Sequence, residues 1–319
     1  METTLDLASL TKQFSDEDAA RAYLEGLRWP NSPVCAHCGA QEPYRIEPGN
    51  GSKTRKGLWK CKACEKQFTV TVGTIFEDSH IPLSKWLLAI HLLCASKKGM
   101  SAHQLHRMLG ITYKSAWFMA HRIRYAMTQP PLVDKLRGVV EADEAYIGGK
   151  TRRGIRGRGS ERKTPVVALV ERKGRVRSFP MEHVTAKNLR AAMRQNIESS
   201  ATVMTDDFKP YRVFAGGDFA DHQTVNHSKG EYVRGDAHTN TAENFFSIVK
   251  RGIGGVYQHV GKQHLHRYLN EFGFRYNSRD VKDGVRAILA AEGSEGKRLT
   301  YKRPSVSNCR TVQREATVK

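Results

Sequence analysis

The sequence lacks an apolar run of about 18 residues, the length that a membrane-spanning helix requires. Its start, METTLDLASLTKQFSDEDAA, has neither the basic beginning nor the apolar core of a secretory signal peptide. No internal repeat is visible along the chain. These absences predict a cytoplasmic protein with no membrane partner.

Acidic residues are scarce relative to basic ones. The chain has 32 Asp and Glu against 52 Lys and Arg, which gives a formal net charge of +20. A positive field of this size favours polyanions, and nucleic acid is the first candidate, with an anionic membrane surface as the rival. Hydrophobic residues are 39% and charged residues 26%, as in folded soluble proteins. The length of 319 residues suits two or three domains.

Cysteine is also rare, with six in the chain, but four of them form two Cys-x-x-Cys pairs separated by residues 39–60. In a reducing compartment such pairs indicate metal before disulfide. Two pairs supply a tetrahedral thiolate site for Zn²⁺, and four thiolates leave no open position for catalysis. The pattern predicts a zinc ribbon over 30–75 with a structural zinc, and a redox role for either pair is the alternative. The predicted ligands are Cys35, Cys38, Cys61 and Cys64.

Helical patterns occupy the N-terminal segment 1–29, with one short helix expected over 11–28, and the region 80–128. In the second region Leu-Gly-Ile-Thr ends one helix and starts another near Tyr113, which is the spacing of a helix-turn-helix. A recognition helix in the major groove uses basic side chains. The predicted DNA contacts on it are Lys114, Arg122 and Arg124. A plain helical bundle with a solvated basic face is the alternative.

A proline-containing linker over 128–134 precedes a region of strand patterns. We expect strands over 138–149, 164–172, 174–182, 201–207 and 221–227, and helices over 185–199 and 240–251, with Thr185 capping the first helix. This α/β order is that of a ribonuclease-H-like domain, predicted over 135–285. A basic tail over 292–319 is expected to be poorly ordered.

The segment 150–163 is unusually basic, because seven of its fourteen residues are Lys or Arg. We interpret it as an insertion that clamps phosphates, which adds affinity for DNA with little sequence information. A flexible solvated loop is the alternative. The arginines assigned to this clamp are Arg152, Arg153, Arg156 and Arg158.

Three places offer carboxylates inside the predicted α/β domain. They are Glu141, Asp143 and Glu144 in EADEAY, Asp206 and Asp207 in TDD, and Glu243. Phosphoryl transfer by two Mg²⁺ or Mn²⁺ ions about 3.5–4 Å apart requires several carboxylates that converge. Adjacent side chains on a strand point to opposite faces, so Asp206 and Asp207 do not both reach one metal pair while the strand continues. Glu141 shares a face with Asp143 and is its rival.

Glu243 and Lys250 are seven residues apart in HTNTAENFFSIVKRG, which is about two helical turns, so both lie on one helix face. A carboxylate there can hold a metal while the lysine contacts a phosphate. Capping is the alternative: Asn240 as N-cap with Glu243 reaching back, and Lys250 near the negative helix end.

Five stretches closely resemble the ISXO-like insertion-sequence transposases of bacteria: FEDSHIPLSKWLLAI, KKGMSAHQLHRMLGITYKSAWFMAHRIR, VEADEAYIGGK, HTNTAENFFSIVKRGIGGVY and LNEFGFRYNSR. The resemblance runs from the zinc ribbon to about residue 280. It implies a ribonuclease-H-like core of the DDE type that cleaves DNA at transposon ends and transfers strands. It assigns Asp143, Asp206 and Glu243 as the acids that bind magnesium or manganese, followed by the basic Lys250.

The same resemblance implies transposon ends and target DNA as partners, a homo-oligomer on DNA, and a bacterial, nucleoid-associated location. Two alternatives remain. One is a zinc-ribbon and helix-turn-helix regulator without catalysis, against which the intact acidic triad argues. The other is a ribonuclease-H-like nuclease or resolvase that cuts without joining, because one acidic site activates either water or a 3′-hydroxyl.

Overall fold

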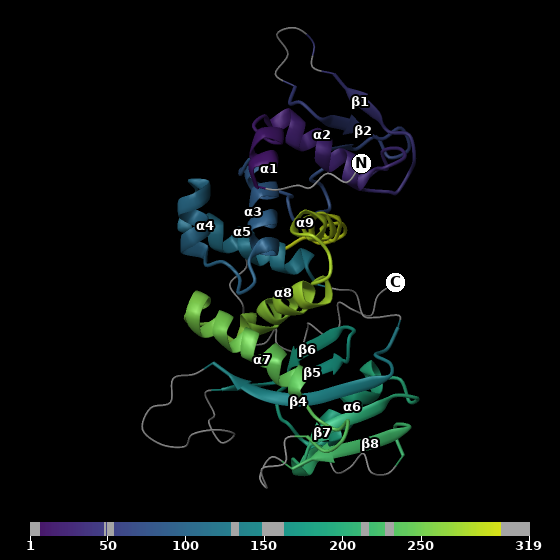
Figure 1. The fold of residues 1–319 in the computed structure, drawn as a ribbon. Helices are drawn as coiled ribbons and strands as arrows, with labels where there is room; N and C mark the ends of the chain where they lie inside the picture. Colours follow the sequence, from purple (N-terminus) through teal and green to yellow (C-terminus); the bar gives the residue numbers. More distant parts are fainter. Residues whose placement is uncertain are drawn as a thin grey trace. The chain divides into compact units, whose positions relative to one another are not determined.

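The computed structural model describes residues 7–47, 49, 54–128, 134–148, 163–211, 217–226 and 233–300. The chain divides into two compact units, residues 1–128 with 280–302 and residues 129–279 with 303–319 (Figure 1). Within the described ranges, no helix has both the length and the apolar character that crossing a membrane demands.

The first unit begins with two helices, α1 (Leu7–Gln13) and α2 (Glu17–Arg28). The single helix expected over 11–28 is therefore wrong. Asp16 adopts an extended backbone, and its side chain accepts a hydrogen bond from the N–H of Asp18 at 3.3 Å. Aspartate is a strong N-cap, so it starts a new helix where helical periodicity alone would continue the old one.

A small antiparallel sheet follows, with the order β1 (Tyr44–Ile46), β2 (Leu58–Lys60) and β3 (Gln67–Phe68). Trp29, directly after α2, packs edge-on against Trp59 and Phe68. Trp59 also donates its indole N–H to Glu25 of α2 at 3.2 Å. Helix α2 is thus fastened to the sheet, and the ribbon region starts earlier in the chain than the predicted residue 30.

Three helices complete the central part of this unit: α3 (Leu83–Ala95), α4 (Ala102–Leu109) and α5 (Tyr113–Ala126). Ser101 caps α4 by accepting from the N–H of Gln104 at 3.1 Å. Gly110 ends α4 at a φ of 59°, a left-handed conformation that glycine adopts without steric cost. Thr112 then caps α5. The two helices and their short turn lie where the sequence predicts them.

The C-terminal helix α9 (Asp283–Glu292) belongs to this first unit and packs against α3. The predicted boundary at 285 is therefore wrong, because a local pattern does not show which helix an amphipathic face will meet. Lys297 donates hydrogen bonds to Ala126 O at 3.0 Å and Thr128 O at 2.7 Å. The chain is thus held in place beyond 292, and residues 301–319 lie outside the described part.

The second unit is an α/β domain built on a mixed five-stranded sheet (Figure 1). Its elements, in chain order, are β4 (Val139–Ile147), β5 (Thr164–Glu171), β6 (Val176–Pro180), α6 (Ala186–Asn196), β7 (Thr202–Asp206), β8 (Asp221–Val225), α7 (Asn240–Gly252), a π-helical turn η3 (Ile253–Tyr257), η4 (Lys262–His264) and α8 (Leu265–Asn277). The strand order is β6-β5-β4-β7-β8. Strands β4 and β7 are parallel neighbours, which brings the first and fourth strands of this domain together.

The two faces of this sheet have different covers. Helices α7 and α8 lie over one face, while α6 lies over the other (Figure 1). On β4, Ala145 and Ile147 pack with α7 and α8, whereas Val140 and Ala142 pack with α6. The alternation of side chains along β4 therefore directs its odd-numbered residues, Asp143 included, toward the α7 face.

Candidate active site and metal centre

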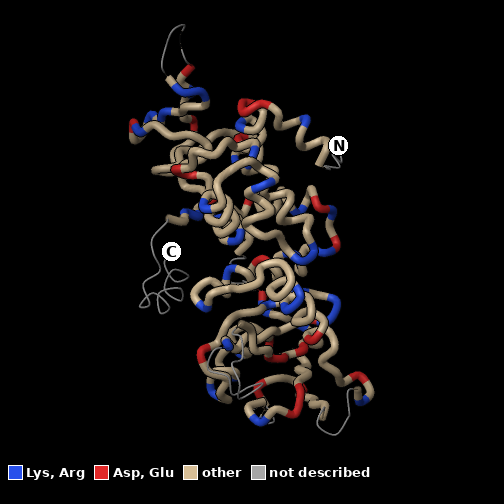
Figure 2. Tube along the Cα trace, turned by 90° about the vertical axis from the view of Figure 1, so that its left-hand side faces the viewer, with Lys and Arg blue, Asp and Glu red and all other residues tan. Residues whose placement is uncertain are grey.

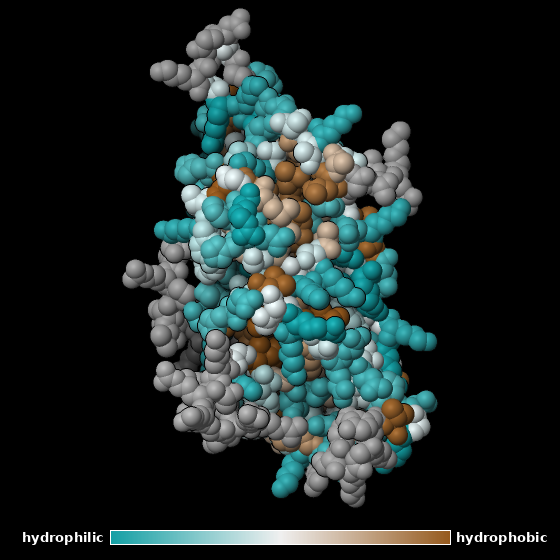
Figure 3. Space-filling view, turned by 60° about the vertical axis from the view of Figure 1, so that its left-hand side comes forward, coloured by the Kyte–Doolittle hydropathy of each residue, from teal (hydrophilic) through white to brown (hydrophobic). Residues whose placement is uncertain are grey.

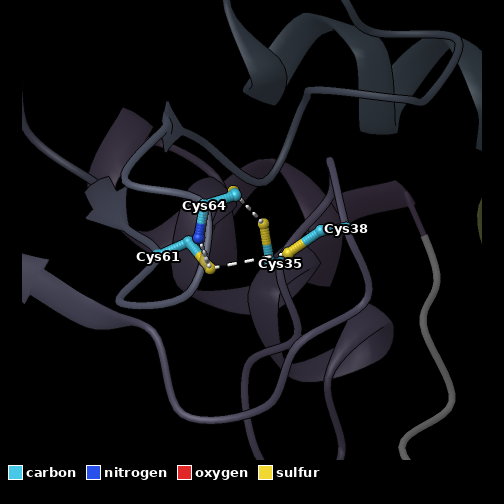
Figure 4. A group of neighbouring side chains, drawn as sticks. All are labelled: Cys35, Cys38, Cys61 and Cys64. Atoms are coloured by element: carbon cyan, nitrogen blue, oxygen red, sulfur yellow. Dashed lines mark hydrogen bonds between the residues drawn. The ribbon is translucent and has the colours of Figure 1, made fainter.

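The four paired cysteines meet between the two knuckles of the ribbon (Figure 4). Their sulfur atoms all lie within 4.8 Å of one another, with Cys35 Sγ 3.7 Å from Cys64 Sγ and Cys38 Sγ 3.6 Å from Cys61 Sγ. Four sulfurs at about 2.3 Å from a tetrahedral zinc are about 3.8 Å apart. The donor set and its spacing therefore fit one Zn²⁺.

Backbone amides support thiolates in this cluster. The N–H of His37 lies 3.4 Å from Cys35 Sγ, and the N–H of Cys64 lies 3.5 Å from Cys61 Sγ. The Cys64 amide, helped by that of Ala63, lowers the pKa of Cys61 to about 7. The ring of His37 contacts the carbonyl of Gln67 at 3.2 Å instead. The geometry is that of a closed structural site.

The carboxylates of Asp143 and Asp206 belong to neighbouring parallel strands on one face of the sheet. The last paired residues of β4 and β7 are Glu141 and Met204, and each strand then continues by two residues to an aspartate. Met204 packs with Val139 on this face. Because side chains alternate along a strand, both aspartates point to the side that α7 covers.

Electrostatics links these aspartates to two residues of α7. Burial, together with the charges of Asp206 and Glu243, raises the pKa of Asp143 to about 7, while the Glu144 N–H and Lys250 act to lower it. Like charges disfavour ionisation of a partly buried carboxyl, and a cation favours it. Asp143 thus interacts electrostatically with the other three predicted site residues, Asp206, Glu243 and Lys250.

This group is wider than the cysteine cluster. In the part of the chain that the structure describes, the four cysteines are the only group of three or more His, Cys, Asp or Glu side chains close enough to hold one metal ion. Their sulfur atoms all lie within 4.8 Å of one another. Two ions about 3.5–4 Å apart do not require so tight a set, because the ligands are divided between them. An array of carboxylates around a positive centre is the arrangement that hard divalent cations prefer.

The acids adjacent in sequence occupy different places. Glu144 is buried, and its parity on β4 is that of the residues packed with α6. Tyr211 lies buried near it: burial raises the pKa of this phenol, and the charges of Glu144, Asp143 and Asp206 raise it further. Strand β7 ends at Asp206, so Asp207 follows the strand rather than belonging to it.

Glu141 shares the face of Asp143 but is occupied by other partners. Its side chain is 0% exposed and accepts hydrogen bonds from Arg172 Nε at 2.7 Å, Thr241 N at 2.7 Å and Ala242 N at 3.1 Å. The predicted rival of Asp143 therefore holds the beginning of α7. No local pattern around Glu141 predicts this role, because its partners are 31 to 101 residues away.

The start of α7 differs from the predicted capping box. Thr239 is the N-cap and Asn240 the first helical residue, and the Thr239 side chain accepts no capping hydrogen bond. The Glu243 N–H donates to Thr239 O at 3.0 Å, and the Thr239 hydroxyl donates to Glu243 Oε1 at 3.4 Å. Glu243 and Lys250 are both exposed, at the edge of the helix face that carries the buried Phe245, Phe246 and Val249. The expected common face is confirmed.

The predicted DNA contacts of α5 are only partly accessible. Lys114 is exposed, whereas Arg122 and Arg124 are 6% and 2% exposed. Arg122 donates to the carbonyls of Ile75 at 2.9 Å and Glu77 at 2.7 Å. The assignment of these two arginines to DNA contact is therefore wrong, because they face the interior of the unit. Arg152, Arg153, Arg156 and Arg158 lie outside the described residues.

The surface is polar and mixed in charge. Lysine and arginine positions occur in both units and acidic positions interrupt them (Figure 2), and hydrophilic residues cover most of the face in Figure 3. At the start of α5, Tyr113 is exposed and its ring stacks on His103 with centroids 4.3 Å apart. Next to Lys114, these rings place aromatic and cationic groups at one helix end.

Two family models and a full-length relative match this chain. A transposase zinc-ribbon model matches residues 15–67, and an ISXO2-like transposase domain model matches residues 135–277. A relative from Halobacterium salinarum, named as an uncharacterized protein in transposable element ISH50, is 32% identical over 87% of this chain and 97% of its own length. The chain belongs to the ISXO2-like transposase family. The resemblance seen in the sequence is thereby confirmed.

Two further similarities are weaker. An uncharacterized transposase-like protein from Haemophilus influenzae is 26% identical over 35% of this transposase and 89% of its own length. A chain in the structure of a simian T-cell lymphotropic virus intasome is 12% identical, with a TM-score of 0.28, over 53% of this transposase and 63% of that chain. A TM-score this low does not indicate a shared fold.

The zinc assignment predicts about one zinc per chain by elemental analysis, retained against mild chelation. Cys61→Ser removes one of four thiolates and is expected to release the metal and unfold the ribbon, because bound zinc contributes directly to folding. The second unit is expected to keep its own thermal transition. Zinc-free protein with an unchanged melting curve contradicts the assignment.

The raised pKa of Asp143 predicts a pH-dependent stability in magnesium-free buffer. The folded protein holds this proton up to a pKa of about 7 and the unfolded chain only to about 3.8. Stability therefore falls as pH rises from about 4 to 7, by roughly 1–4 kcal/mol. Asp143→Asn removes the charge, so we expect this variant to melt several degrees above the wild type at pH 8 and close to it at pH 4.5. An equal difference at both pH values contradicts this account.

Proposed function

We propose that this transposase is a DDE-type polynucleotidyl transferase that binds the ends of an insertion sequence, cleaves the DNA there and joins the freed ends to target DNA. The observation that carries the proposal is that Asp143 and Asp206 lie on one face of two neighbouring parallel strands, with Glu243 and Lys250 on the helix that covers that face. Three carboxylates from three elements interact electrostatically at Asp143 in a protein with a net charge of +20. This arrangement suits the proposed chemistry.

The architecture of the second unit supports a ribonuclease-H-like fold. Three consecutive antiparallel strands are followed by a helix and two parallel strands, in the order β6-β5-β4-β7-β8. This order brings the middle of β4 next to the end of β7, where the two aspartates lie. The family membership agrees with the same class of reaction.

In the proposed mechanism Asp143, Asp206 and Glu243 hold two Mg²⁺ or Mn²⁺ ions. When bound, such ions activate the attacking oxygen and stabilise the leaving oxygen of an in-line displacement. Lys250 lies on the face of Glu243 and contacts a phosphate or the end of the cleaved strand. The raised pKa of Asp143 in the metal-free protein reflects the same crowding of negative charge that binds cations.

DNA binding is assigned to the first unit. Helices α4 and α5, with their short turn at Gly110, have the lengths and caps of a helix-turn-helix. Lys114 and the exposed Tyr113 at the start of α5 are the groups proposed to contact DNA. The segment 150–163 is proposed as a second, sequence-independent contact through its arginines. Partners are transposon ends and target DNA, on which the chain forms a homo-oligomer.

The test uses DNA that carries the ends flanking the gene of this protein, with Mg²⁺ and mapping of the 3′ ends and joined products. Asp143→Asn, Asp206→Asn and Glu243→Gln each remove a metal ligand and are expected to lower cleavage and joining by more than about 100-fold. Binding to the ends is expected to survive. Asp207→Asn, a matched change one residue beyond β7, is expected to be milder.

Each rival has its own outcome in this assay. Full activity of all three variants refutes the acidic site and leaves a regulator that binds DNA without catalysis. Loss of activity in Asp207→Asn but not in Asp206→Asn moves the second ligand by one residue. Cleaved ends without joined products identify a nuclease or resolvase instead of a transferase.

A further inference from the structure

The buried carboxylate of Glu141 connects the central strand β4 to the first turn of α7. Four donors hydrogen-bond to its two oxygens, and one imidazole nitrogen lies within salt-bridge distance. Oε2 accepts from the backbone N–H groups of Thr241 at 2.7 Å and Ala242 at 3.1 Å. Oε1 accepts from Arg172 Nε at 2.7 Å and from the Thr241 hydroxyl at 2.9 Å, with His238 Nδ1 at 3.2 Å. The side chain is 0% exposed.

Only a carboxylate suits this environment. The first N–H groups of a helix have no partner inside the helix, and a negative charge is favoured at that end. Thr239, the residue at the N-cap position, accepts no such bond with its side chain. Glu141 therefore does from a neighbouring strand what a capping residue does within the chain. An amide at this position would turn an N–H₂ group toward donors at one of its two ends.

The cap is directly coupled to the proposed metal ligands. Asp143 lies two residues beyond Glu141 on the same face of β4, and Glu243 directly follows the capped Ala242 in the first turn of α7. The Glu141 side chain, with the short backbone segments that lead from it to Asp143 and from Ala242 to Glu243, thus sets the distance between these two acids. Arg172 reinforces the connection, because its Nη2 also donates to His238 O at 3.1 Å.

We infer that Glu141 is a positioning residue: its capping of α7 holds Glu243 at the distance from Asp143 that joint metal binding requires. This inference rests on the proposed function, since it concerns the same acidic site. Glu141 itself is directed to α7 and contributes no metal contact. Residues that hold metal ligands in place typically change metal affinity about 10–100-fold when altered.

The experiment compares Glu141→Gln with Glu271→Gln in the full chain. Glu271 is a matched control, because it is also 0% exposed and also accepts from an arginine, but these donors, Arg275 and Tyr257 Oη, belong to α8 and η3. Amide hydrogen exchange is measured on peptides covering 239–246, and Mn²⁺ affinity is measured by titration with electron paramagnetic resonance. Asp143→Asn defines which part of the Mn²⁺ signal belongs to the acidic site.

Glu141→Gln is expected to accelerate exchange at Thr241 and Ala242 and to weaken Asp143-dependent Mn²⁺ binding by about 10–100-fold. Glu271→Gln is expected to change neither. Wild-type exchange and Mn²⁺ affinity in Glu141→Gln overturn the inference, as does an equal effect of both variants. If Glu141→Gln does not fold, Thr241→Val removes the hydroxyl donor alone, and a smaller change of both readouts in the same direction is expected; no change overturns the inference.

The two claims fail in different ways. If the wild type shows no Asp143-dependent Mn²⁺ binding, the proposed function fails, and slower or unchanged exchange in Glu141→Gln would refute the cap separately. If the wild type shows Asp143-dependent Mn²⁺ binding and Glu141→Gln has the same Mn²⁺ affinity and exchange as the wild type, the proposed function stands and the positioning role is refuted.

Discussion

The parallel pairing of β4 with β7 is the constraint on which the rest of the second unit depends. It brings two aspartates to one face of the sheet, where burial and the charge of Asp206 oppose the ionisation of Asp143. A fold gains no stability from such a pair without a cation. Helix α7 covers that face and contributes one further carboxylate, Glu243, and one lysine, Lys250. The apolar side of α7 packs into the core.

The position of α7 follows from a second buried charge. Glu141 is fully enclosed and accepts hydrogen bonds from four donors, so its desolvation is offset by charge-assisted hydrogen bonds. The two negative groups of the β4 face thus have different roles. Glu141 is paired with Arg172 and the start of α7, whereas Asp143 faces the carboxylates of Asp206 and Glu243, where we propose that metal ions bind.

Local features of the sequence predicted much of this structure. Strand alternation located β4, β5 and β7, the Leu-Gly-Ile-Thr turn located the junction of α4 and α5, and a cap at Thr185 located α6. The two Cys-x-x-Cys knuckles predicted the cysteine cluster, since the two cysteines of each pair are only three positions apart in the sequence. Asp143 and Asp206 were assigned by the resemblance to the family.

Long-range contacts could not be predicted in the same way. Arg122 has the periodicity of a basic surface residue, but it is buried because carbonyls some 45 residues away accept its hydrogen bonds. Glu141 resembled a metal ligand because its strand face is that of Asp143, and only the tertiary structure shows that α7 takes up both of its oxygens. Helix α9 has an ordinary amphipathic pattern, which does not identify α3 as its partner.

The central claim is that Asp143, Asp206 and Glu243 together hold the divalent ions of this transposase. The most direct measurement is anomalous X-ray diffraction from crystals of the protein soaked in Mn²⁺. The account predicts manganese peaks in contact with carboxylate oxygens of all three residues, with Glu141 still bonded to the start of α7. Manganese bound instead by Glu141 or Asp207, or no manganese at these strands while the protein is active on DNA, would contradict it.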